Sequence, residues 1–81
     1  MQDIYKLIDD IKMQKLDHLD TRVNDVLDSS NDDALFILGE TLYDFGLTPQ
    51  GLEVFRTLYQ KYPDESEVLI YFIEGLMAEN E

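Results

Sequence analysis

The residues of this chain that could carry chemistry gather in one polar run, Asp28-Ser29-Ser30-Asn31-Asp32-Asp33. A run of carboxylates can ligate calcium, but an EF-hand loop needs Gly at its sixth place and Glu at its twelfth. Counted from Asp28, those places hold Asp33 and Gly39, so the run does not predict a calcium site. Ser30 or Asn31 can instead cap a following helix, whose positive N-terminal end suits the acids. The run therefore predicts the start of a helix.

Nucleophilic and acid–base catalysis find no support in the residue pattern. Ser29 and Ser30 lack the glycines of a nucleophile elbow. The single histidine, His18, has no local partner that would make it a metal ligand or a general base. The segment Gly46-x4-Gly51 lacks the Lys that would follow in a phosphate-binding loop. We therefore expect no enzyme activity, no metal site and no cofactor.

The charge balance points to a class of partner. Among 81 residues, 18 are Asp or Glu and 6 are Lys or Arg, which gives a net charge of −12. Such a surface repels nucleic acid and anionic lipid and attracts basic partners, although solubility alone can also explain it. The six cations are scattered, so no nucleic-acid partner is expected. A hydrophobic content of 44% with nine aromatic residues is enough to form a folded core.

The sequence also bears on the compartment. The longest apolar run, residues 68–73, is far shorter than the ~20 residues that span a bilayer. The first ten residues carry acids where a secretory signal would carry bases. The absence of Cys fits a reducing environment. We therefore expect a cytoplasmic protein that has no membrane contact.

Helical spacing of apolar residues predicts five helices, near residues 3–12, 14–28, 32–45, 48–61 and 65–79. No Gly or Pro separates the first two, so a single bent helix is the alternative there. The side chains expected to face inward in the last three helices are Leu35, Leu38, Leu42, Phe45, Leu52, Phe55, Leu58, Leu69, Phe72, Ile73 and Leu76.

Local signals place the helix ends. Gly46 supplies a left-handed stop, and Pro63 ends the next helix. Thr48-Pro49 predicts an N-cap followed by Pro at the first helical position. Asp64-x-x-Glu67 resembles a capping box at the start of the fifth helix.

Residues 32–65 carry a more specific pattern. The order is Leu35-x2-Leu38-Gly39-x2-Leu42, then Gly46, then Gly51-x3-Phe55, then Pro63. This segment resembles a tetratricopeptide repeat, with Leu35 for the usual Trp, Leu42 for the usual Tyr and Gly51 for the usual Ala. The resemblance implies an all-α, right-handed solenoid segment of antiparallel helix pairs. Gly39 would then allow close helix approach, while Gly51 and Phe55 would make the crossing contact.

The resemblance extends to a division of the chain. Residues 32–65 form the repeat, and residues 1–31 are expected to be a degenerate N-terminal capping pair. Residues 66–81 are expected to be the first helix of a further, truncated repeat, because Leu69 and Leu76 repeat Leu35 and Leu42 at an offset of 34. The chain would then be the N-terminal segment of a longer, bacterial-type repeat protein. The apolar residues of helix 65–79, among them Val68, Ile70, Tyr71 and Met77, predict a homodimer through that helix.

In tetratricopeptide proteins the first helix of each pair lines a concave groove, and the resemblance implies the same here. The groove residues would be Phe36, Glu40, Tyr43, Asp44, Glu67, Ile70, Tyr71, Glu74 and Met77. Aromatic surfaces beside carboxylates suit a basic or amphipathic peptide. Two alternatives stay open: Phe36 and Tyr43 pack against the first two helices, and Glu40 and Glu74 form a solvated face.

The sequence thus favours a non-enzymatic protein–protein interaction module that binds a basic or apolar peptide, or a partner protein, in a concave helical groove. The alternative is a structural N-terminal cap and oligomerisation segment of a longer repeat protein. Peptide binding by this chain on its own distinguishes the two.

Overall fold

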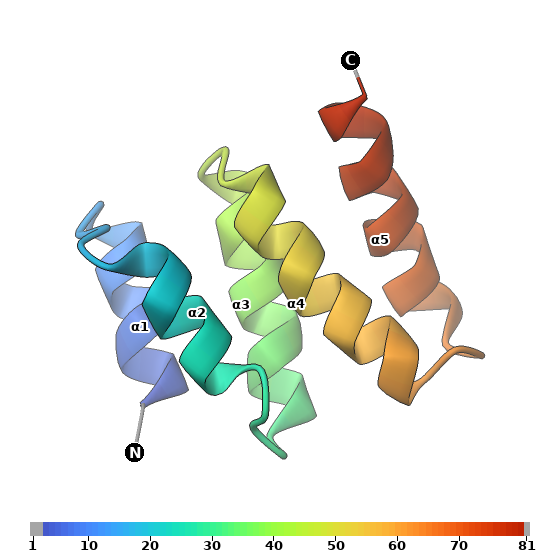
Figure 1. Ribbon diagram of the computed structural model, residues 1–81, viewed down its shortest axis with the longest axis horizontal. Coiled ribbons are helices and arrows are strands. Elements are labelled where there is room, and N and C mark those ends of the chain that lie inside the picture. The colour runs from blue at the N-terminus through green and yellow to red at the C-terminus, as the bar shows by residue number, and fades with distance from the viewer. Residues whose placement is uncertain (1–2, 81) are drawn as a thin grey trace.

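The computed structural model describes residues 3–80 and builds them from helices joined by short connections (Figure 1). The helices are α1 (Ile4–Lys12), α2 (Leu19–Val26), α3 (Asp32–Asp44), α4 (Thr48–Lys61) and α5 (Ser66–Glu79). No strand occurs among the described residues, so the prediction of an all-α chain with five helices is confirmed. Met1, Gln2 and Glu81, which belong to the expected segments 1–31 and 66–81, lie outside the described residues.

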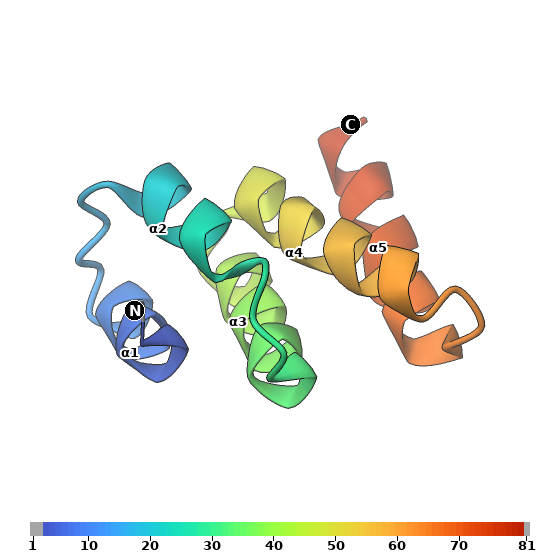
Figure 2. The same cartoon turned by 60° about the horizontal axis from the view of Figure 1, so that its bottom comes forward.

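Consecutive helices run in opposite directions and lie in two layers. Figure 2 shows α1 and α3 in one layer and α2 and α4 in the other, with α5 following beside α4. The helix contacts agree, because α3 packs against α1 and α4 while α4 packs against α5 and α2. The molecule measures 30 × 30 × 16 Å, and its radius of gyration of 11.7 Å is typical of a compact chain of this length. The reversals bring the start of α3, the end of α4 and the start of α5 to one edge (Figure 1).

The core runs along α3. Its residues Leu35, Leu38 and Leu42 are fully buried, as expected, and each buried Leu contributes about 1.5–3 kcal/mol through loss of apolar surface. Phe55 of α4 is also fully buried, and it stands over Gly39 of α3. The expected inward residues Leu52 and Leu58 are buried too. These six predicted core residues of α3 and α4 are therefore confirmed.

The prediction of a helix over residues 14–28 is wrong at its N-terminal end. Helix α1 ends at Lys12, and Gln14 and His18 both have left-handed backbone angles, with φ of 60° and 57°. The amide of Lys15 donates to the carbonyl of Asp10, which is the hydrogen bond of a Schellman helix stop. Gln14 takes the place that Gly usually fills, so the break carries no Gly signal. The alternative of a single bent helix is wrong for the same reason.

The ends of α3 follow local signals. The Asn31 side chain caps the helix by accepting from the amide of Ala34 at 3.2 Å. Gly46, with φ of 76°, supplies the left-handed stop after the helix, and the amide of Leu47 donates back to the carbonyl of Leu42. The expectation that Phe45 faces inward is wrong, because Phe45 is the C-cap and its side chain is exposed.

Both expected caps after Gly46 are wrong. Helix α4 has Leu47 at its N-cap and makes no side-chain capping bond there, so Thr48 is already helical and Pro49 lies within the first turn. Helix α5 has Glu65 at its N-cap, again without a side-chain capping bond. Pro in the first turn costs nothing, since its missing N–H would have no helical partner. The stop before Pro63 is confirmed, because α4 ends at Lys61 with Tyr62 as its C-cap.

The expected core stripe of α5 is confirmed at Phe72, which packs against the core and stacks on Tyr59 of α4, and is wrong at its other three residues. Val68 and Gly75 are its buried residues, and Tyr71 and Phe72 are half-buried. The expected stripe residues Leu69, Ile73 and Leu76 are exposed by 36%, 44% and 37%. Helix α5 is apolar on most sides, so periodicity alone cannot identify which face meets α4.

No helix among residues 3–80 combines the length and the apolar character that crossing a bilayer requires.

Candidate functional site

An aromatic cluster joins α3, α4 and α5 around Phe55. The Phe36 ring meets Phe55 edge-on at 5.3 Å between centroids, and the Tyr43 ring lies 5.2 Å from Phe55. From α5, the Tyr71 ring stacks on Phe55 at 5.0 Å with an interplanar angle of 6°. Phe36 also meets Tyr71 edge-on at 5.1 Å. Offset and edge-on pairs of this kind add to the stabilisation from buried area, so the cluster fixes α5 against α3 and α4.

Two hydrogen bonds close this cluster in opposite directions. The hydroxyl of Tyr43 on α3 donates to the backbone carbonyl of Tyr71 on α5 at 2.9 Å. The hydroxyl of Tyr71 donates to the carboxylate of Glu40 on α3 at 2.9 Å. Burial and the nearby Glu74 carboxylate raise the pKa of Tyr43 to about 12. The hydrogen bond to Glu40 raises the pKa of Tyr71 as well.

Three glycines make room for these rings. A Cβ on Gly39 would lie 2.5 Å from the Phe55 ring, and a Cβ on Gly51 would collide with the Tyr43 ring. A Cβ on Gly75 would meet both the Tyr43 hydroxyl and Leu52. The prediction of close approach at Gly39 is therefore confirmed. The contact at Gly51 is made by Tyr43, while Phe55 covers Gly39.

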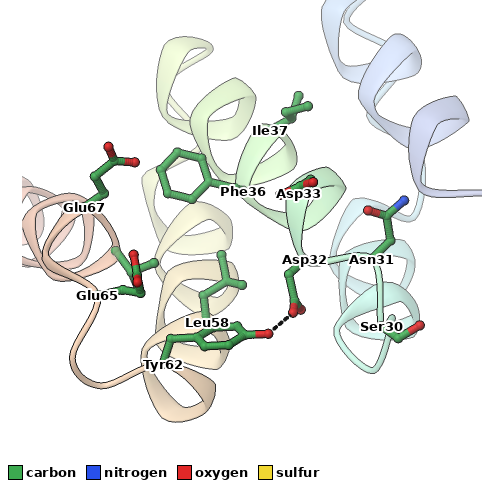
Figure 3. Close-up of a pocket in the computed structure, with 11 residues that line it drawn as sticks. Ser30, Asn31, Asp32, Asp33, Phe36, Ile37, Leu58, Tyr62, Glu65 and Glu67 are labelled. Carbon is green, nitrogen blue, oxygen red and sulfur yellow. Dashed lines mark hydrogen bonds between the residues drawn. The ribbon is translucent and has the colours of Figure 1, made fainter.

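A hollow of about 760 Å³ opens beside this cluster, at the edge where α3 starts, α4 ends and α5 starts (Figure 3). Its apolar lining comes from Phe36, Ile37, Leu58 and Val68. Its acidic lining comes from Asp32, Asp33, Glu65 and Glu67. In Figure 3 the Tyr62 ring reaches from α4 toward Asp32 at the start of α3. The hollow thus combines an apolar floor with a negatively charged rim.

Of these four acids, Asp32 is the one whose side chain forms a hydrogen bond or an ion pair with other described residues. The Tyr62 hydroxyl donates to Asp32, and the Lys61 ammonium lies 3.0 Å from the same carboxylate. These two contacts, with the Tyr62 hydrogen bond foremost, lower the pKa of Asp32. Within residues 3–80 the side chains of Asp33, Glu65 and Glu67 form no hydrogen bond or ion pair. Their oxygens are available to a cation that enters the hollow.

The residues that the sequence predicted for the groove divide into three groups. Phe36 and Glu67 line the hollow. Glu40, Tyr43 and Tyr71 form the hydrogen-bonded part of the aromatic cluster. The exposed remainder lies along α3 and α5 and consists of Asp44, Ile70, Glu74 and Met77.

The sequence left open that Phe36 and Tyr43 pack against the first two helices, but the ring contacts of both residues are with other helices. Both rings meet Phe55 of α4 and Tyr71 of α5. Sequence reasoning missed Asp33, Tyr62 and Glu65 as lining residues of the hollow. They belong to three helix ends, and a register within one helix cannot bring such residues together. The antiparallel order of the helices is the signal that could have found them, because it places those ends at one edge.

Two other polar features have structural explanations. Asp10 on α1 is 7% exposed and pairs with Arg22 on α2 at 2.9 Å and with Lys6 at 3.3 Å. The hydrogen bond from Arg22, followed by the contact with Lys6, lowers the pKa of Asp10. A smaller hollow of about 520 Å³ lies between α2 and α4, where Gln50 donates to Asp20. It offers neither an aromatic floor nor unengaged acids in comparable number.

The structure also bears on metal binding among residues 3–80. No group of three or more His, Cys, Asp or Glu side chains in that part of the chain is placed to hold a metal ion. His18, exposed and with a left-handed backbone, precedes α2 as its N-cap without a capping bond. No known family model, curated protein or solved structure shows significant similarity to this chain.

Proposed function

We propose that this chain is a non-enzymatic protein-interaction module that binds a basic, partly apolar peptide in the hollow between α3, α4 and α5. The observation that carries the proposal is the pairing of an apolar floor with unengaged carboxylates. Phe36, Leu58 and Val68 can take an apolar side chain, while Glu65 and Glu67 can take Lys or Arg beside it. The net charge of −12 favours the same class of ligand.

The proposal includes a tetratricopeptide-type architecture. Two features support it: the sequence pattern of residues 32–65, and the order in which α1 lies beside α3 while α2 lies beside α4. The groove would then be formed by first helices of successive pairs, as the resemblance implies. Phe36 and Glu67 are the members of that expected groove that line the hollow.

Apolar burial must supply most of the affinity. An exposed ion pair is worth about 0.2–1 kcal/mol, so two or three carboxylates cannot hold a peptide by themselves. Burial of one large apolar side chain contributes about 1.5–3 kcal/mol. The acids act chiefly on selectivity and association rate, because the long-range field attracts a basic peptide before contact. Asp33 and Glu67 also lie in first helical turns, where they stabilise α3 and α5.

A charge-reversed pair of peptides tests the proposal. The probes are a heptapeptide of alternating Lys and Leu and its counterpart of alternating Glu and Leu, titrated by fluorescence anisotropy. The protein variants are Ile37→Arg in the hollow and Met13→Arg at the far end, which change the net charge equally at exposed positions. We expect the Lys peptide to bind the parent and Met13→Arg alike, and to bind Ile37→Arg about tenfold more weakly.

The opposite results would refute the function. Equal binding of the two peptides would show that the protein does not prefer basic peptides. Lys-peptide binding that Ile37→Arg leaves unchanged would show that the peptide binds outside the hollow. Binding of neither peptide would favour the structural cap as the role of this segment.

A further inference from the structure

Helix α5 carries an exposed apolar surface outside the lining of the hollow. We call it the outer face and define it as Leu69, Ile73 and Leu76, flanked by Ile70 and Met77. The three central residues follow the i, i+4, i+7 spacing of one helical stripe. The flanking residues are exposed by 54% and 63%. Contiguous apolar stripes of this kind mark interaction surfaces on folded proteins.

The chain itself shows what covers such a stripe. Residues 34 positions earlier, on α3, are Leu35, Gly39 and Leu42. All three are buried, and Phe55 of the antiparallel helix α4 lies on Gly39. The same offset relates Ile70 and Met77 to Phe36 and Tyr43, whose rings contact α4 and α5. Every exposed apolar position on the outer face thus has an α3 counterpart that is buried or packed against another helix.

The charges repeat as well. Helix α3 carries the acids Asp32, Asp33, Glu40 and Asp44 and no base. The helix that covers it, α4, carries two bases: Arg56 pairs with Glu53 of the same helix, and Lys61 pairs with Asp32 of α3 at 3.0 Å. Helix α5 carries Glu67, Glu74 and Glu79 and again no base. Charge complementarity therefore calls for a covering helix that is basic.

Position 73 limits the size of the residue that the covering helix can carry opposite it. Gly39 leaves room for the Phe55 ring, since even a Cβ there would lie 2.5 Å from it. Its counterpart on α5 is Ile73, whose side chain would occupy the equivalent space. A helix that lies on α5 as α4 lies on α3 must therefore carry a small residue opposite Ile73.

From these observations we propose that the outer face of α5 docks an amphipathic helix of a partner protein, with Lys or Arg beside its apolar stripe and a small residue opposite Ile73. A second copy of this chain is the competing occupant. Its net charge of −12 and the acids of its own α5 would meet like charges across the contact. The docking surface is separate from the hollow and does not depend on the function proposed for it.

A peptide based on α4 tests the proposal on the full 81-residue chain. This peptide, called the small-residue probe, has the sequence of residues 47–62 with Phe55→Ala, and a hydrocarbon staple replaces Glu53 and Thr57 to keep it helical. Two control probes differ from it in one property each: one retains Phe55, and the other reverses charge through Arg56→Glu and Lys61→Glu. Binding is followed by fluorescence anisotropy.

The protein variants share one charge change at three exposed places. Ile73→Arg lies on the outer face, Ile37→Arg in the hollow and Met13→Arg at the far end, with exposed fractions of 44%, 42% and 61%. We expect Ile73→Arg to weaken binding of the small-residue probe about tenfold or more, because it places a charge in an apolar contact. Ile37→Arg and Met13→Arg should leave that binding within about twofold, and both control probes should bind the parent more weakly than the small-residue probe does.

Three results would overturn the proposal: no binding of the small-residue probe, equal weakening by all three variants, or tighter binding of the acidic probe. Sedimentation equilibrium of the parent and Ile73→Arg tests a fourth such result. If the parent is a dimer and Ile73→Arg is a monomer, the outer face binds a second copy of this chain. Loss of Lys/Leu heptapeptide binding in Ile37→Arg reports on the hollow alone, so failure of one proposal does not mimic failure of the other.

Discussion

The hydroxyl of Tyr43 donates a hydrogen bond to the backbone carbonyl of Tyr71 at 2.9 Å, which ties the end of α3 to the middle of α5. The Tyr71 hydroxyl in turn donates a hydrogen bond to the carboxylate of Glu40 on α3. Two walls of the hollow, the starts of α3 and α5, belong to these two helices. The Tyr43–Tyr71 hydrogen bond therefore fixes α3 relative to α5, the two helices whose starts form walls of the proposed binding site.

Tyr43→Phe should lower the unfolding free energy by about 0.5–1.5 kcal/mol, the usual net value of one hydrogen bond. The folded-state pKa of Tyr43 is raised to about 12 from an ordinary value of 10, so its contribution is complete below pH 10 and is lost as pH rises toward 12. Urea melts between pH 8 and pH 12 (chosen to span that window) should show a shallower alkaline loss in Tyr43→Phe. Tyr5→Phe, at an exposed tyrosine, is the matched control. An identical alkaline profile in parent and Tyr43→Phe would contradict this assignment.

Gly39→Leu should destabilise the chain more than a surface change such as Asp44→Ala. The first carbon of the new side chain already meets the Phe55 ring at 2.5 Å, and that ring is fully buried and cannot move aside freely. Overpacking of this kind costs about 1–3 kcal/mol. Urea melts of the two variants check the prediction, and a Gly39→Leu variant that melts like the parent would refute the close α3–α4 packing.

Helix α3 is the part of the fold that local signals predict best. The Asn31 cap, the buried leucines and the Gly46 stop each leave a recognisable residue type at its place. The glycine at position 39 predicts close packing for the same reason, since only a residue without a side chain fits there.

The break between α1 and α2 and the packed face of α5 are not predictable in this way. Gln14 and His18 adopt left-handed angles that side-chain-bearing residues rarely take, so their types carry no break signal. Helix α5 offers apolar residues on several sides, and the choice of Val68 and Gly75 for burial depends on the position of α4. Tertiary contact decides both features.

The residues of the candidate site are likewise only partly predictable from local sequence. Phe36 is expected in the groove from the register that the resemblance implies, and Glu67 is expected near it. Asp33, Tyr62 and Glu65 join the hollow only because the antiparallel helices bring three ends together. No periodicity within a single helix links those positions.

Acid should weaken the fold partly through Asp10. Its pKa is lowered by the hydrogen bond from Arg22, so its stabilising contribution is present above its unfolded value of 3.8 and is lost as pH falls through the folded value. Asp10→Asn should therefore lower stability at pH 7 and flatten the acid loss below pH 4 (just above that unfolded value). Thermal melts across this range, with the exposed neighbour Asp9→Asn as control, measure the effect. Equal behaviour of the two variants would deny a role for the Asp10–Arg22 pair.

Phe36→Ala should weaken binding of the Lys/Leu heptapeptide more than Glu40→Gln does. Phe36 lines the hollow and supplies apolar contact, while Glu40 is held by the Tyr71 hydroxyl. Stopped-flow measurements should also show that added salt slows association more than it speeds dissociation. Because Phe36 packs on Phe55 and Tyr71, circular dichroism of the variant must first match the parent. A larger loss in Glu40→Gln would mean that charge, and not apolar burial, carries the affinity.

The most direct test of binding in the hollow is a ¹⁵N-NMR titration of the chain with the Lys/Leu heptapeptide. We predict amide shift changes concentrated at the lining residues Asp33, Phe36, Ile37, Tyr62 and Glu67, with little change along α2. The Glu/Leu peptide should leave the same amides unmoved at equal concentration. Shifts of equal size with both peptides, shifts that avoid these residues, or no shifts with either peptide would contradict a peptide-binding role for this surface.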